Sequence, residues 1–133
     1  MHRSQLAGFI IDCQTDDLDQ AAEFWSQALG YAPKHSTDPE DENYVTLDTG
    51  PNEVHIELQK VDHPSRVHLD IESGDIEAEV SRLEKLGAKR IKQVRTWWIM
   101  EAPTGHRFCV IRPQRSEFAN EANQWDDDDS NFV

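Results

Sequence analysis

The order of expected secondary-structure elements repeats, and this repeat constrains the fold more than any other feature of the sequence. The first half has an apolar strand, a helix and three further strand-like segments, at residues 6–11, about 18–29, 31–36, 43–49 and 53–60. The second half repeats that order, at residues 67–71, 76–86, 90–94, 96–101 and 107–112. A β-α-β-β-β unit of about 50 residues, present twice, is typical of two modules that complete one another's core. The sequence therefore predicts an α+β fold.

Both predicted helices carry clear start and stop signals. Asp16 or Asp17 can cap the first helix, and Gly30 ends it. Asp75 is placed to cap the second, which ends at Gly87. The apolar residues of the first helix recur on one face: Leu18, Ala21, Ala22, Trp25, Ala28 and Leu29. Each helix is therefore expected to bury one face against the strands of its own half.

Length and apolar content bound the class of protein. The chain has 133 residues, which fits one domain with a real core. It contains no apolar run of about 18 residues, and its N-terminus has no signal-peptide pattern. Cys13 and Cys109 are too few for a disulfide framework, so both are expected as reduced thiols packed in strands. We expect a cytoplasmic protein with no membrane partner.

The charge is strongly acidic. A net charge of −13 argues against nucleic acid as a partner, because phosphate binding requires clustered Lys and Arg. Part of this charge lies in four consecutive Asp residues at 126–129, inside a C-terminal segment, 116–133, that has no clear hydrophobic period. We expect this segment to be an acidic appendage to a domain at 1–115. The acidic surface favours a neutral or cationic ligand through electrostatic steering.

The segment "RVHLDIES" at residues 66–73 has two different faces when it is read as a strand. Val67, Leu69 and Ile71 alternate with a polar row, which consists of Arg66, His68 and Asp70. The apolar face is expected to pack against the core. The polar row either faces water or lines a pocket.

Four motifs resemble the vicinal oxygen chelate superfamily, and in particular its small glyoxalase-like domains. They are "IDC" at 11–13, "AAEFWSQALGY" at 21–31, "RVHLDIESGDIEAEVSRLEKLGA" at 66–88 and "APTGHRFCVIRP" at 102–113. The resemblance implies the glyoxalase/bleomycin resistance/dioxygenase fold, in which two βαβββ modules, here about 5–60 and 66–113, pair as half-barrels around a ligand. It implies that the polar row of 66–73 faces that cavity. It also implies a homodimer.

Metal-dependent members of this superfamily take four ligands from four strands. The matching positions here are Ile10, Glu57, His68 and Cys109. Glu57 and His68 are good ligands for a divalent ion such as Ni, Zn, Mn or Fe, whereas Ile10 has no donor atom and Cys109 offers a soft thiolate. The pattern is broken, so we expect no complete metal site, although Asp12, His55 or Asp70 could substitute for the missing ligands.

Without a metal, the same strands describe a polar ligand pocket. The residues expected on its side are Asp12, His55, Glu57, Arg66, His68, Asp70, Arg107 and Cys109. His68 beside Asp70 or Glu57 can act as a general base, and Arg66 can hold an anionic group of the ligand. Trp98 is expected as a flat apolar wall for a planar ligand. The alternative is that the buried charges only satisfy one another and fix the strand register.

Three functions stay open at this point. The first is binding of a small organic molecule in a polar cavity, with acid–base chemistry through His68 and Glu57 if the protein is an enzyme. The second is a divalent-metal-dependent lyase, isomerase or dioxygenase of the glyoxalase I kind. The third is a drug-sequestering protein of the bleomycin-resistance kind, which binds without catalysis. Four other histidines lie near ends or turns and are expected at the surface: His2, His35, His63 and His106.

Overall fold

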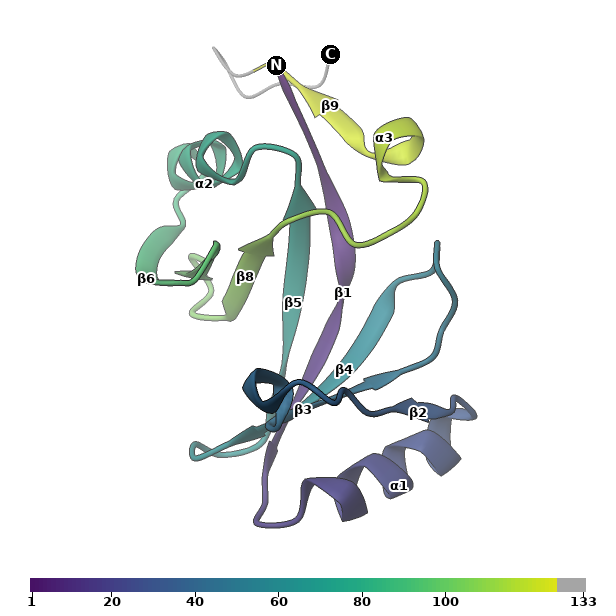
Figure 1. Cartoon of the computed structure of the whole chain (residues 1–133). Helices are drawn as coiled ribbons and strands as arrows, with labels where there is room; N and C mark the ends of the chain where they lie inside the picture. The colour runs from purple at the N-terminus through teal and green to yellow at the C-terminus, as the bar shows by residue number, and fades with distance from the viewer. Residues whose placement is uncertain (127–133) are drawn as a thin grey trace. The chain divides into compact units, whose positions relative to one another are not determined.

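The computed structural model describes residues 1–126, so residues 127–133, which hold most of the acidic run at 126–129, lie outside the described part. The order of elements confirms the predicted α+β class, with β-α-β-β-β present twice (Figure 1). The first set is β1 (His2–Gln14), α1 (Leu18–Leu29), β2 (Pro33–Lys34), β3 (Tyr44–Leu47) and β4 (His55–Val61). The second is β5 (Arg66–Ser73), α2 (Ile76–Lys85), β6 (Lys89–Val94), β7 (Trp97–Glu101) and β8 (Arg107–Ile111). A short helix η1 (Pro39–Asp41) precedes β3, and α3 (Phe118–Glu121) and β9 (Asn123–Trp125) follow β8.

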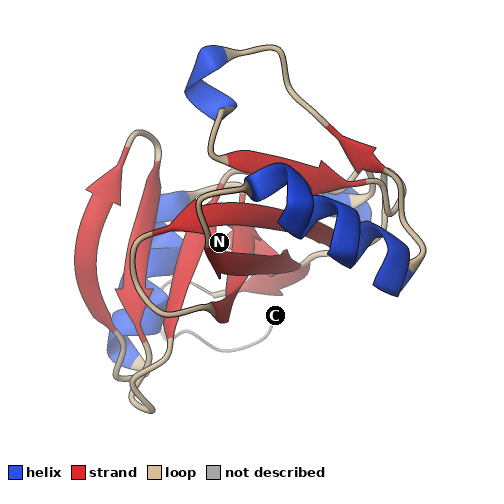
Figure 2. Ribbon diagram, turned by 90° about the horizontal axis from the view of Figure 1, so that it is seen from below, coloured by secondary structure: helices blue, strands red, loops and turns tan. Residues whose placement is uncertain are grey.

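The chain forms two compact units. The N unit is Gly8–His68, and the C unit combines Met1–Ala7 with Leu69–Val133. Both boundaries fall inside strands, so β1 and β5 each contribute residues to both units. In each unit a helix lies against strands of the sheet (helices blue and strands red in Figure 2).

In the N unit the strands lie in the order β2-β3-β4-β1. The pairs β2–β3 and β3–β4 are antiparallel, and β4–β1 is parallel. Helix α1 contacts β2, β3 and β4 (Figure 1). The buried residues of this core are Cys13, Leu18, Ala22, Val45, Leu47 and Leu58, with Ile11, Ala21, Trp25 and Ile56 packed against them.

The predicted signals of α1 are confirmed. The Asp17 carboxylate accepts a hydrogen bond from the backbone N–H of Gln20 at 3.1 Å. Gly30 adopts φ 79°, the left-handed conformation that an L side chain disfavours, and its N–H donates to the Ser26 carbonyl. Trp25 packs on the core as expected, while its neighbour Phe24 is 62% exposed and meets the Trp25 ring edge-to-face.

In the C unit the strands lie in the order β5-β8-β7-β6. The pair β5–β8 is parallel, and the other two pairs are antiparallel, with a bulge in β6 between Arg90 and Lys92. The Asp75 carboxylate caps α2 by accepting from the Ala78 N–H at 3.0 Å, as predicted. Helix α2 covers one face of these strands, and the buried residues between them are Val80, Leu83, Met100, Phe108 and Val110.

The C-terminal segment docks on the C unit through residues 114–125. The buried carboxylate of Glu72 accepts from the backbone N–H groups of Gln114 and Arg115 at 2.6 and 3.0 Å. Strand β9 then pairs antiparallel with residues 2–4 of β1. This pairing corrects the prediction for His2, which is only 6% exposed.

A buried carboxylate joins the ends of the chain to α2. Glu79 is 0% exposed and accepts hydrogen bonds from His2 Nε2, from Ser4 Oγ, and from Nε and Nη2 of Arg82, all at 2.8–2.9 Å. The Arg82 guanidinium lies 3.7 Å from the centre of the Trp125 ring, and Trp125 Nε1 donates to Ser4 Oγ at 2.8 Å. The side chains around Glu79 therefore hold β9 in place.

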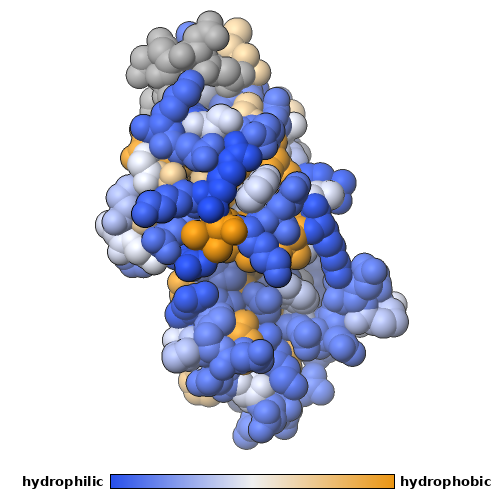
Figure 3. Space-filling view, turned by 90° about the vertical axis from the view of Figure 1, so that its left-hand side faces the viewer, coloured by the Kyte–Doolittle hydropathy of each residue, from blue (hydrophilic) through white to orange (hydrophobic). Residues whose placement is uncertain are grey.

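The surface is largely polar. Hydrophilic side chains predominate on the face shown in Figure 3, in keeping with a content of 29% charged residues. Within β5, Val67 and Leu69 are 58% and 44% exposed, which corrects the prediction that they face the helices; only Ile71 packs on the core under α2. No helix among the described residues has the length and apolar character needed to cross a membrane.

Candidate functional site

The sheet face of the N unit that turns away from α1 is polar. Because Cys13 and Leu58 pack toward α1 and side chains alternate along a strand, Asp12 and Glu57 point to the opposite face. The register places Ile10 opposite Glu57, and Asp12 opposite Gln59. The neighbouring strand β3 adds Thr46 opposite Glu57 and Tyr44 opposite Gln59. Asp12, His55 and Glu57 therefore lie on the same face of the sheet, as alternation along the strands predicted.

Asp12 and His68 form a close pair on this unit. Nδ1 of His68 lies 2.8 Å from Oδ2 of Asp12, and the two side chains are 13% and 2% exposed. An ionised carboxylate can only accept, so Nδ1 is the donor in this contact, and in the neutral tautomer that donates through Nδ1 the lone pair is on Nε2. The sequence analysis expected Asp70 or Glu57 to orient His68; the carboxylate found at hydrogen-bond distance from its Nδ1 is that of Asp12.

Arg66 approaches the same carboxylate from the solvent side. Its Nε lies 3.7 Å from Oδ2 of Asp12, and half of its side chain is exposed. This separation is too long for a hydrogen bond, so the guanidinium is an ionic neighbour of the pair. A half-exposed guanidinium next to a histidine can bind an anionic group of a ligand bidentately.

The second oxygen of Asp12 is unusual. Oδ1 is buried and accepts no hydrogen bond from residues 1–126. An unsatisfied buried polar atom costs about 1–3 kcal/mol, and such atoms in native proteins call for a functional or solvent explanation. The Asp12 carboxylate is therefore held at a free-energy cost in a position where it orients His68.

The sequence analysis missed two residues of this face. Gln59 Nε2 donates to the Tyr44 hydroxyl at 3.0 Å, directly beside the strand position of Asp12. Gln59 lies two residues after Glu57, so the same alternation that selected Glu57 could have found it. His55 lies opposite Gly8, where an added Cβ would come within 2.1 Å of the His55 carbonyl oxygen. Only glycine fits at position 8.

The corresponding face of the C unit carries the other predicted residues. Asp70 lies opposite Cys109, which in turn lies opposite Ile99, and this row turns away from α2. Asp70 is 6% exposed and Cys109 is half-buried. Arg107 shares this face and forms an ion pair with Glu101 at 3.3 Å. Asp70, Arg107 and Cys109 thus share one face of the sheet, as alternation along the strands predicted.

Trp98 does not have the predicted orientation. Its side chain packs with Met100 on the core under α2, and the Arg90 guanidinium lies 5.1 Å from the centre of its ring. The cause is the register of β7 on β8, which sets Trp98 opposite Val110 and Met100 opposite Phe108, both core residues. The tryptophan on the face that turns away from α2 is Trp97.

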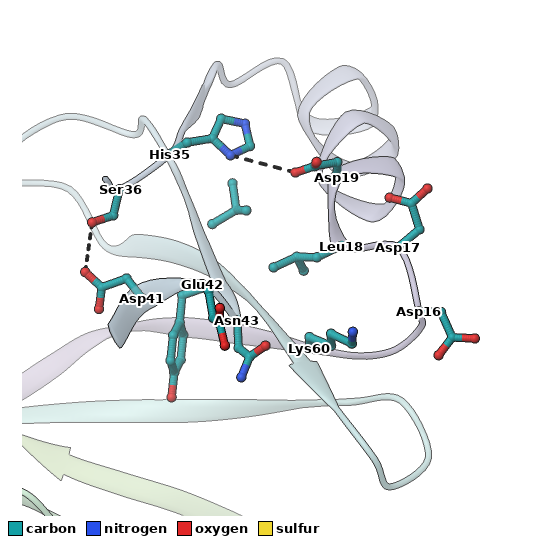
Figure 4. Close-up of a pocket in the computed structure, with 12 residues that line it drawn as sticks. Asp16, Asp17, Leu18, Asp19, His35, Ser36, Asp41, Glu42, Asn43 and Lys60 are labelled. Carbon is teal, nitrogen blue, oxygen red and sulfur yellow. Dashed lines mark hydrogen bonds and ion pairs between the residues drawn. The ribbon is translucent and has the colours of Figure 1, made fainter. Parts of the chain in front are cut away.

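A cavity of about 420 Å³ lies elsewhere on the N unit, between the start of α1 and the segment that leads into β3 (Figure 4). Ser36 Oγ donates to Asp41 at 2.9 Å on one side, and Nδ1 of His35 lies 3.9 Å from Asp19 on the other. Its remaining lining is Asp16, Asp17, Leu18, Glu42, Asn43, Tyr44, Val45 and Lys60. Of these residues, only Tyr44 also touches the polar face, through Gln59.

One of the four positions at which the resemblance places metal ligands holds a side chain with no donor atom. Ile10 is 4% exposed and is the strand partner of Glu57, so an apolar side chain occupies the position from which the first ligand would come. The carboxylate of Asp12 on the same strand is engaged with His68. The superfamily's four-ligand set is therefore incomplete, and we derive no chemical step through a metal.

The cysteine on the helix side is a core residue. Burial raises the pKa of the Cys13 thiol, and the nearby charge of Asp12 raises it further. A raised pKa keeps the sulfur protonated, and only the thiolate is a good nucleophile or metal ligand. Cys13 is thus structural, as the sequence predicted.

Similar solved structures share the fold of this chain. A family model of the glyoxalase-like domain matches residues 8–111, and the chain belongs to this family. A search of curated proteins found no match.

Methylmalonyl-CoA epimerases are among the similar structures. Methylmalonyl-CoA epimerase from Mycobacterium tuberculosis has 18% identity and a TM-score of 0.58, over 81% of this chain and 87% of that one. A Streptomyces coelicolor methylmalonyl-CoA epimerase variant in complex with 2-nitronate-propionyl-CoA has 14% identity and a TM-score of 0.57, over 83% and 98%. A hypothetical protein from Bacillus halodurans C-125 has 15% identity and a TM-score of 0.61, over 86% and 98%. At these identities the likeness establishes the fold.

Proposed function

We propose that this protein binds a small organic acid or acyl thioester and moves a proton on it, with His68 as the base and acid. The observation that carries the proposal is the 2.8 Å contact between His68 Nδ1 and the buried carboxylate of Asp12. A carboxylate in this position fixes the tautomer and stabilises the imidazolium that forms when Nε2 takes a proton. The proposal needs no metal.

The proton transfer can be written from the chain's own residues. Nε2 of His68 takes a proton from carbon next to a carbonyl group, so that a C–H bond breaks and an N–H bond forms. The electron pair of the C–H bond forms a C=C bond as the π pair of the carbonyl group moves onto its oxygen, which gives an enolate; return of the proton to carbon reverses these changes and regenerates the neutral imidazole. Arg66, half-exposed beside the pair, binds an anionic oxygen of the ligand. Glu57, on the same face of the N unit, is a second candidate acid–base residue.

The epimerases among the similar structures support this reaction class. Epimerisation of a carbon acid requires removal and return of one proton, which is the step that an oriented histidine can perform. The present chain would perform it with a different set of residues, because Ile10 interrupts the metal-ligand pattern of the superfamily.

Deuterium exchange tests the proposal directly. Methylmalonyl-CoA and free methylmalonate are incubated with the protein in D2O, and incorporation at C2 is followed by mass spectrometry against a protein-free control. We expect exchange with the wild type, loss of exchange in His68→Gln, and a reduction of about tenfold to a hundredfold in Asp12→Asn. His63→Gln is the matched control, because within residues 1–126 His63 is bonded only to the Pro64 carbonyl in its own loop.

Two results would refute the proposal. Exchange that is equal in the wild type and His68→Gln would remove the histidine from the reaction. Absence of exchange with both compounds, in protein shown to be folded by circular dichroism, would remove proton transfer on this class of ligand.

A further inference from the structure

The sheet face of the C unit that turns away from α2 combines aromatic, aliphatic and cationic side chains at the β6–β7 hairpin. Since Met100 packs under α2, its neighbours Trp97 and Ile99 on the same strand lie on the other face. The register then assigns two more residues to that face: Val94 is opposite Trp97, and Lys92 is opposite Ile99.

The turn of this hairpin brings a second cation over the aromatic ring. Arg95 has φ 51°, the only positive φ of a non-glycine residue in residues 1–126. Its guanidinium lies 5.8 Å from the centre of the Trp97 ring, within the range of a cation–π contact. A strained backbone conformation of this kind persists only where the surroundings fix it, and it is often found at binding sites.

The charges near this face favour an anion. Lys92 is exposed, and it makes no hydrogen bond or ion pair among the described residues. Strand pairing places Asp70 in the same cross-strand row as Lys92, but three strands away. At the usual strand spacing this is a separation of about 14 Å. Glu101 is paired with Arg107. Arg90 belongs to the other face, where Glu77 and Glu84 bind it.

We propose that Trp97, Val94 and Ile99 form a flat wall that, with Lys92 and Arg95 at its edge, binds a planar aromatic anion. The rings of such a ligand stack on the indole or on the guanidinium plane, and its carboxylate or similar group meets the two cations. This binding surface lies wholly within the C unit. It goes beyond the proton transfer proposed for His68 and does not depend on it.

Three small probes separate the parts of the proposal by isothermal titration calorimetry on the full chain. 2-Naphthoate has both the planar rings and the charge, naphthalene-2-methanol has only the rings, and cyclohexanecarboxylate has only the charge. We expect saturable binding of 2-naphthoate and at least about fivefold weaker binding of each of the other two.

Substitutions then assign the site. Trp97→Leu is expected to weaken 2-naphthoate about fivefold or more, and Lys92→Gln and Arg95→Asn about threefold to fivefold each. Asn tolerates the left-handed conformation, so Arg95→Asn removes the cation while it keeps the turn. Two exposed side chains of the N unit provide matched controls, Phe24→Leu for the aromatic ring and Lys34→Gln for the charge; neither is expected to change the affinity.

The proposal is overturned if 2-naphthoate does not bind, or binds no better than the alcohol. It is also overturned if the affinity is unchanged in Trp97→Leu, or equally reduced in the control variants. Thermal unfolding of every variant shows whether it is folded, and Arg95→Asn, at an exposed position in the turn, keeps the test valid if Trp97→Leu is unstable.

Discussion

Replacing Glu79 by Gln is expected to destabilise the protein strongly. The substitution keeps the size of the side chain and removes its charge. Four hydrogen bonds reach this carboxylate at 2.8–2.9 Å, two of them from Arg82. The carboxamide oxygen can retain part of them, but the –NH2 group faces donors and leaves the Arg82 guanidinium without its counter-charge.

The magnitude follows from burial. Glu79 is 0% exposed, and removing one partner of a buried ion pair typically costs about 3–5 kcal/mol. Taking about 3 kcal/mol, because the amide keeps some contacts, the expected fall in Tm is about 10 °C for a chain of this size. Urea unfolding followed by far-ultraviolet circular dichroism should show a lower midpoint with an unchanged m value.

The same helix supplies a matched control. Glu77 also pairs with an arginine, Arg90, at 2.6 Å, but its side chain is 66% exposed. Glu77→Gln should therefore cost less than about 1 kcal/mol, since exposed ion pairs contribute little. If Glu79→Gln were no more destabilising than Glu77→Gln, the reasoning from burial would be wrong.

Three further predictions concern pH, packing and reactivity. Burial alone would raise the pKa of Glu79, but hydrogen bonds from Arg82, His2 and Ser4 outweigh it and leave the pKa below its usual 4.5. The stability that these bonds contribute is fully present above the usual pKa of 4.5, and it is lost as the pH falls through the lowered pKa of the folded protein. The unfolding free energies of wild type and Glu79→Gln should therefore converge in acid. Gly8→Ala should cost about 2–3 kcal/mol in urea unfolding, whereas Gly74→Ala, whose added Cβ would meet the nearest atom at 3.6 Å, should cost far less. Cys13 should react with iodoacetamide at least about tenfold more slowly in the folded protein than in urea, because burial raises its pKa.

The sequence predicted what local chemistry determines. The capping residues Asp17 and Asp75, the stop at Gly30, and the order of strands follow from the hydrogen-bonding and backbone preferences of a few neighbouring residues. Their signals do not depend on where distant strands lie, so they could be interpreted from the chain alone.

What could not be predicted depends on strand register. Alternation shows that Trp97 and Trp98 face opposite ways, but it does not say which of them faces the helix. The pairing of Trp98 with Val110 decides that. Comparison with the apolar pair Phe108 and Val110 in the next strand was the signal that could have decided it.

The Asp12–His68 pair and the burial of His2 have the same origin. Asp12 and His68 are 56 positions apart, and alternation predicts the face of each residue without its partner. Residues 2–4 were not expected in a strand because the strand that pairs with them, β9, has no hydrophobic period of its own.

The pairing of β1 with β9 has a consequence for how the chain comes together during synthesis. Ser4 and Trp125 are joined by a hydrogen bond across 121 positions, so the pairing of residues 2–4 cannot be completed until residue 125 has been synthesised. Loop closure over such a distance is slow, and N-terminal parts of a chain emerge first. The polar groups around Glu79 and Trp125 thus come together only after residue 125 has been synthesised. A chain truncated before residue 125 would retain the residues of the N unit, whereas the C unit would lack the contacts of Trp125 with Ser4 and Arg82.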